Sequence, residues 1–151
     1  MSNEYCIIHL PARTLATVEA FVAQRDIPDR IPTMFDEVNA WIKSAEVMPA
    51  GKNMILYDQF REDGMRMRVG FPVSEAFMND GEISCTELSS LSTAQVRHVG
   101  SYSHLPAVHT ALHSWCMDMS LNRAELSIEE YGDWHKDESK LVTNVYVQIL
   151  E

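Results

Sequence analysis

The sequence predicts an α+β domain in which a strand-helix-strand-strand module occurs twice and forms an antiparallel sheet with two main helices on one face. Two stretches, near residues 33–44 and 104–120, carry apolar residues every three or four positions, which is typical of an amphipathic helix. Runs rich in branched and aromatic residues flank both stretches and favour strands. Trp41 and Trp115 are 74 positions apart, and so are Tyr57 and Tyr131.

In the first half, the 26–32 stretch contains two prolines and is expected to be a loop that leads into the first helix. Pro32 should lie near the first turn, where a missing N–H costs little, and the helix should end near Ser44. Glu62-Asp63-Gly64 predicts a hairpin turn. The strands expected in this half are 5–10 and 14–22, which are one strand or two with a break, followed by 54–57 and 65–73.

The second half repeats this order after the polar turn at 78–81. The apolar face of its helix, from about His104 to Ser120, includes Trp115, which like Trp41 we expect in the core. The strands expected here are 83–88, 93–99, the run around Glu129, and 141–150.

This repeat indicates one domain, 1–151, with module one at about 4–75 and module two at about 82–151. Phe35-x5-Trp41 in the first helix aligns with His109-x5-Trp115 in the second. A duplicated sheet places a natural ligand cleft between the halves.

Charge argues against nucleic acid as a direct partner, because the formal net charge is −10. Arg61, Arg66 and Arg68 cluster, but acidic residues interrupt them, so a solvated strand edge is the better interpretation. The three cysteines are widely spaced, so we expect them to be free thiols in a reducing compartment. The stretch from Met1 to Glu4 lacks the basic start of a signal peptide. We expect a cytoplasmic protein with no membrane span.

No cofactor or metal is expected. His109 and His113 have the i, i+4 spacing of a helical metal pair, but no Glu lies between them to complete HExxH.

Three short motifs carry a family resemblance that covers the whole chain: Leu10-Pro11-Ala12-Arg13, Gly100-x-Tyr102-x-x-Leu105 and Glu129-x-Tyr131. In this order they resemble the GyrI-like small-molecule-binding family, which occurs free-standing or as the effector-binding part of AraC-type and MerR-type regulators. The resemblance implies a pocket glutamate two residues before a tyrosine on the strand after the second helix. The matching positions here are Glu129 and Tyr131.

Strand alternation places Glu129 and Tyr131 on one face and Ile128 and Glu130 on the other. We expect apolar Ile128 to face the helices, which leaves Glu129 toward the ligand, although Glu130 stays open as the cleft residue. A carboxylate among aromatic rings favours hydrophobic, flat or cationic ligands. The predicted ligand-binding residues are Glu129, Tyr131, Trp134 and Tyr102.

Three functions remain open. The first is a stand-alone module that senses or sequesters small hydrophobic, possibly cationic, molecules, since too few residues remain for a helix-turn-helix. The second, implied by the resemblance, is a hydrolase of reactive cyclopropane-containing compounds with Glu129 as catalytic residue. The third, also implied by the resemblance, is an inhibitor that modulates DNA gyrase, in which case gyrase or a regulator would be a protein partner.

Overall fold

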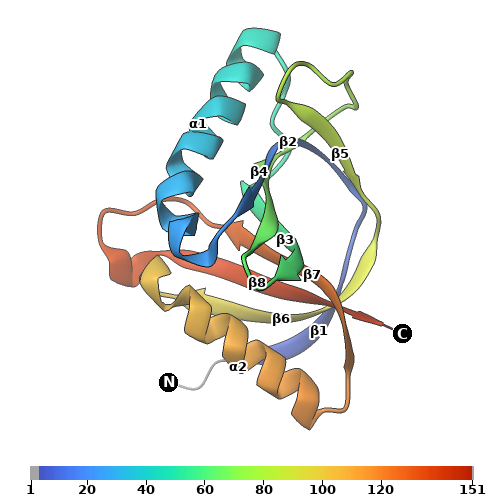
Figure 1. Ribbon diagram of the computed structural model, residues 1–151, viewed down its shortest axis with the longest axis vertical. Helices are drawn as coiled ribbons and strands as arrows, with labels where there is room; N and C mark the ends of the chain where they lie inside the picture. The colour runs from blue at the N-terminus through green and yellow to red at the C-terminus, as the bar shows by residue number, and fades with distance from the viewer. Residues whose placement is uncertain (1–3, 151) are drawn as a thin grey trace. The chain divides into compact units, whose positions relative to one another are not determined.

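The computed structural model describes residues 4–150 and confirms the α+β class (Figure 1). Residues 1–3, on which the signal-peptide expectation partly rests, lie outside the described residues. No helix within residues 4–150 is long and apolar enough to cross a bilayer. The elements are β1 (Tyr5–Leu10), β2 (Arg13–Val22), α1 (Ile27–Ala45), β3 (Met54–Arg61), β4 (Gly64–Val73), β5 (Ser84–Leu88), β6 (Leu91–Val99), α2 (Leu105–Asp118), β7 (Asn122–Tyr131) and β8 (Val142–Leu150), with 3-10 turns η1 (Gln24–Asp26), η2 (Tyr102–His104) and η3 (Glu138–Lys140).

The chain forms two compact units. Unit 1 contains the chain up to Pro11 and the chain from Ser90 onward, and unit 2 contains Ala12–Ser89. Each unit has four antiparallel strands, in the order β1-β6-β8-β7 in unit 1 and β3-β4-β2-β5 in unit 2. Strands at equivalent places in the repeat therefore occupy equivalent places in the two units.

The opening strand of each half belongs to the other half's unit. β1 pairs with β6, from Tyr5 opposite Val96 to Leu10 opposite Leu91. β5 in turn pairs with β2. The sequence repeat and the compact units thus have different bounds, because strand pairing joins segments far apart in the chain.

Helix α1 begins earlier than the sequence predicts. It begins at Ile27, with Pro28 in its first turn and Pro32 inside the helix. The expectation of a loop over 26–32 was therefore wrong. Pro28 presets the backbone for the first helical turn, and Pro32, close to that end, removes one backbone hydrogen bond.

The core of unit 2 lies between α1 and strands β2 and β4, which α1 contacts (Figure 1). Met34, Val38 and Ile42 form the buried stripe of α1 at i, i+4 spacing. Trp41 lies beside this stripe and is half-buried, so its assignment to the core was wrong. Its ring lies 4.6 Å from that of Phe77, and its Nε1 donates to Asp80 at 2.9 Å.

The core of unit 1 lies beneath α2, which contacts β6, β7 and β8. Leu105, Val108, Leu112 and Cys116 are the buried residues of α2. Trp115 is half-buried, not core, and stacks on Tyr5 with ring centroids 5.5 Å apart. Helix α2 therefore packs its buried face on the sheet, and Trp115, at the edge of that face, stacks on Tyr5 of β1.

Candidate functional site

Strand β7 carries Glu129 at its carboxyl end, where the strand pairs with β8 and Glu129 lies opposite Val145. The neighbours on the same face, Ser127 and Tyr131, are buried, and Glu129 itself is only 4% exposed. A charged side chain this deeply buried needs hydrogen-bond partners, because removal from water disfavours the ionised form. Its contacts therefore define the site.

Both carboxylate oxygens of Glu129 have a partner within unit 1. The hydroxyl of Tyr131, two residues later on the same strand, donates to Oε1. The imidazole Nε2 of His109 lies 2.7 Å from Oε2. His109 belongs to α2, so a helix and a strand together hold the carboxylate.

The contact between Glu129 and His109 shows which face of β7 lies toward α2, and it corrects the expected orientation of this strand. Because α2 supplies the partner of Glu129, Glu129 lies on the face of β7 that the helix covers. Ile128 points to the opposite face, where it lies across from Tyr146 of β8. The alternation of β7 was predicted correctly, but the assignment of apolar Ile128 to the helix side was wrong. A carboxylate can face a helix when that helix offers an imidazole.

Glu130 has a separate set of partners on the other face of β7. Its Oε1 accepts hydrogen bonds from the Tyr146 hydroxyl at 3.1 Å and from Asn144 Nδ2 at 3.3 Å. The Tyr146 hydroxyl also lies 3.5 Å from Nε2 of Gln95. The two adjacent glutamates therefore belong to different polar clusters.

Tyr102 and Trp134, the other two predicted ligand residues, lie in different surroundings. The ring of Tyr102 packs edge-on against that of Tyr131, with centroids 5.5 Å apart. Partial burial raises the pKa of the Tyr102 hydroxyl, so it stays protonated. Trp134 follows β7 and is 74% exposed. Tyr102 is thus next to the Glu129 cluster, whereas the Trp134 indole faces solvent.

His113 lies one turn after His109 but does not share its role. Its Nε2 is buried and has no hydrogen-bond partner among the described residues. Burial, followed by the charge of Arg123 and by His109, lowers the pKa of His113 and keeps its imidazole neutral. Within residues 4–150, no group of three or more His, Cys, Asp or Glu side chains is arranged to hold a metal ion.

His109 is the contact partner of Glu129 that the sequence interpretation missed. The repeat contained a signal, since His109 aligns with Phe35 of the first helix. Phe35 packs against Phe71 of β4, with ring centroids 5.7 Å apart, so this helical position faces the sheet in unit 2. A titratable residue at a position that faces the sheet predicts a polar partner on a strand, which in unit 1 is Glu129.

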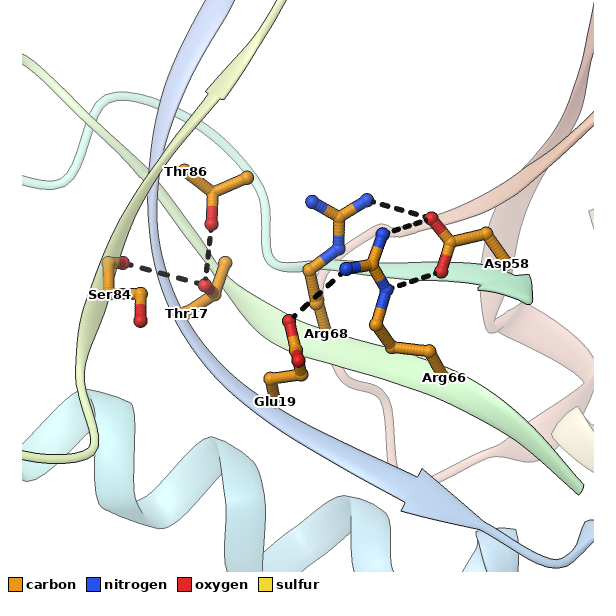
Figure 2. A network of polar contacts seen from close by, with 7 residues as sticks. All are labelled: Thr17, Glu19, Asp58, Arg66, Arg68, Ser84 and Thr86. Carbon is orange, nitrogen blue, oxygen red and sulfur yellow. Dashed lines mark hydrogen bonds and ion pairs between the residues drawn. The ribbon is translucent and has the colours of Figure 1, made fainter.

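Unit 2 has its own polar cluster, on β2, β3, β4 and β5 (Figure 2). Arg66 binds Asp58 through Nε at 2.6 Å and Nη2 at 2.5 Å, and Arg68 adds a third contact at 3.2 Å. Glu19 lies 3.6 Å from Arg66. The hydroxyl of Thr17 contacts that of Thr86 at 2.8 Å and the backbone oxygen of Ser84 at 3.4 Å.

This arginine cluster is structural. Two arginines face two carboxylates, so the cluster has no net charge with which to hold an anion. The strand that carries Arg66 and Arg68 lies between β2 and β3 and is not an edge, so the expected solvated edge was wrong. The guanidinium of Arg66 lowers the pKa of Asp58, which keeps that carboxylate ionised.

The fold is shared with several solved structures. The C-terminal domain of EcmrR has a TM-score of 0.86 and 17% identity, with 100% of this chain and 99% of that chain covered. SAV2435 bound to tetraphenylphosphonium has a TM-score of 0.69 and 14% identity, with 97% and 94% covered. A hydrolase from Listeria innocua has a TM-score of 0.63 and 10% identity, with 97% and 92% covered. At these identities the likeness shows the fold alone.

No curated protein matches the sequence. The family model of the GyrI-like small molecule binding domain, in contrast, matches residues 3–150. This match covers nearly the whole chain. The chain therefore belongs to the GyrI-like small-molecule-binding family.

Proposed function

We propose that this protein is a binding module that senses or sequesters hydrophobic cations at Glu129. The observation that carries the proposal is a buried carboxylate beside two packed tyrosine rings. The side chain of Glu129 is 5% exposed, and the ring of Tyr131, which donates to it, packs against Tyr102. Such a site offers a cation both a charge partner and aromatic surface.

The energetics favour a cationic ligand over an anionic one. A desolvated carboxylate attracts a nearby cation more strongly than a carboxylate in water does. A cation against an aromatic face gains about 0.5 to 2 kcal/mol more. The structural relative SAV2435 was solved with tetraphenylphosphonium, a cation surrounded by phenyl rings, which makes this compound a suitable first probe. Trp134 is proposed as a residue at the rim of the same site.

Titration with tetraphenylphosphonium tests the proposal. At a ligand concentration of about 100 times Kd, the native state gains about 2.7 kcal/mol, which for a chain of this size raises Tm by about 5 to 10 °C. Glu129→Gln keeps the shape of the side chain and removes the charge, so the shift should largely disappear. An equal shift in wild type and Glu129→Gln would contradict a carboxylate-centred site.

A hydrolase is the second candidate, and one contact favours it. His109 and Glu129 form a histidine-carboxylate pair at 2.7 Å, an arrangement that can take a proton from water. Water would attack a strained cyclopropane carbon, the ring C–C bond would break, and its electron pair would take up a proton. The protein would thus add one water to the compound.

Turnover separates the two functions. A reactive cyclopropane-containing compound is incubated with substoichiometric protein, and its loss is followed over time. Loss that continues through many equivalents supports the hydrolase, whereas a plateau at one equivalent supports sequestration.

A further inference from the structure

The Glu129 site contains an imidazole beside the carboxylate. His109 Nε2 lies 2.7 Å from Oε2 of Glu129, close enough for an ion pair whenever the imidazole is protonated. The side chain of His109 is 20% exposed and that of Glu129 is 5% exposed. The imidazole is therefore the partner with more room to move when another group approaches the carboxylate.

A protonated imidazole and a ligand cation compete for the same oxygen. Glu129 Oε1 is already held by the Tyr131 hydroxyl, which stays on the same strand whether or not a ligand is present. Oε2 contacts His109, which belongs to a separate element, α2. Among the hydrogen bonds described within unit 1, this is the only one between α2 and the Glu129 carboxylate. A cation that enters must share or take the place of His109 there.

His109 is the histidine of α2 that contacts the Glu129 carboxylate. His113, one turn later, is kept neutral by burial and by Arg123. His98 of β6 is held by its contact with the Ser101 carbonyl at 3.0 Å. The titratable or charged groups on α2 and on the elements that pack against it are His113, Cys116 and Asp118 on α2, Arg123, Glu125, Glu129, Glu130 and Tyr131 on β7, Arg97 and His98 on β6, Tyr146 on β8, and Tyr102 and His104 in η2.

We propose that His109 is the specificity-determining residue of this site: when protonated it occupies Glu129 as an internal cation and excludes cationic ligands, and when neutral it yields the carboxylate to them. This inference rests on the proposed function and adds to it a ligand preference that changes with pH. Hydrophobic cations therefore bind more tightly as the pH rises. Neutral aromatic compounds bind with little dependence on pH, because they do not need the carboxylate.

The competition has a quantitative signature. While the imidazole of His109 is protonated, each bound cation must displace one proton. The Kd of a cation with fixed charge should then fall about tenfold per pH unit as pH rises, and level off once the imidazole is neutral. Loss of His109 should remove this slope and strengthen binding of the cation at pH 5.5.

The experiment is isothermal titration of the full chain with tetraphenylphosphonium, whose charge does not change with pH, between pH 5.5 and 8. Wild type is compared with His109→Gln and His109→Asn, and His9→Gln on exposed β1 serves as a histidine control. Titration in two buffers of different ionisation enthalpy counts the protons released. Triphenylphosphine oxide serves as the neutral probe.

Wild type and the His9 variant should release about one proton per cation at pH 5.5, and the two His109 variants about none, as the linkage requires. The neutral probe should bind all four proteins with the same flat profile. If the His109 variants bind the cation but keep the wild-type slope, the inference is wrong and the proposed function stands. If wild type does not bind the cation at any pH, the proposed function is wrong, and so is the inference. Circular dichroism and Tm identify a variant that fails to fold. If one His109 variant does not fold, the other His109 variant tests the inference.

Discussion

Glu129 and Glu130 are adjacent in sequence, but their carboxylates lie on opposite faces of β7 and accept hydrogen bonds from different elements. Glu129 is bound by His109 of α2, whereas Glu130 is bound by Tyr146 of β8. Each residue therefore serves as a control for the other, with the same side chain on the same strand.

We expect Glu129→Gln to weaken tetraphenylphosphonium binding by about 10- to 100-fold, and Glu130→Gln to change it by less than about threefold. The first range corresponds to roughly 1.4 to 2.8 kcal/mol for a lost charged partner. Titration calorimetry at pH 8 measures both values. A larger loss in Glu130→Gln than in Glu129→Gln would place the binding site on the other face of β7.

Tyr131→Phe should lower the free energy of unfolding by about 1 to 3 kcal/mol, because it leaves one oxygen of a buried carboxylate without its donor. Tyr146→Phe is the matched control. It removes a hydroxyl that donates to the half-buried Glu130, whose carboxylate keeps Asn144, so a smaller loss of about 0.5 to 1.5 kcal/mol is expected. Urea unfolding monitored by circular dichroism compares them, and an equal loss would mean that Tyr131 and Tyr146 make contacts of the same strength.

Trp134→Ala should leave stability within about 0.5 kcal/mol of wild type, since the indole is 74% exposed. If Trp134 closes the rim over a ligand, tetraphenylphosphonium affinity should still fall by about threefold to tenfold, as for one lost aromatic contact. Thermal unfolding and ligand titration separate the two effects. Unchanged affinity would remove Trp134 from the site.

Asp58→Asn should lower the stability of the protein at pH 7 by about 2 kcal/mol, because Arg66 and Arg68 lose their shared carboxylate. Glu19→Gln is the control, since its contact with Arg66 is long and its side chain is 52% exposed, and it should cost less than about 0.5 kcal/mol.

The pH dependence of the same variant gives a second test. The hydrogen bond from Arg66 lowers the pKa of Asp58 below that of an unfolded aspartate, about 3.9. The resulting stabilisation is present above that unfolded value and is lost as pH falls through the lower folded value. Wild type should therefore lose stability relative to Asp58→Asn below about pH 4. Parallel curves for the two proteins would show that Asp58 does not contribute to acid unfolding.

Local pattern predicted most of the elements. The apolar spacing of Met34, Val38 and Ile42 predicted α1. The alternation around Glu129 predicted β7 and which of its side chains share a face. The start of α1 was misplaced because both prolines of the 26–32 stretch were read as loop residues, although Pro28 is favourable in a first helical turn. The tryptophans were misplaced because spacing alone does not separate the buried stripe of a helix from its flank.

The sequence by itself determined the fold class, the repeat, the family and the motif of Glu129 and Tyr131, because helix and strand periodicity and short motifs act over neighbouring residues. Only the tertiary structure decided that β1 and β5 exchange units, that Glu129 faces α2, and that His109 is its partner. These facts depend on residues 20 to 91 positions apart. A two-residue period separates the faces of a strand but does not say which face a helix covers, so the packing of α2 on the sheet had to be seen before the site could be assembled.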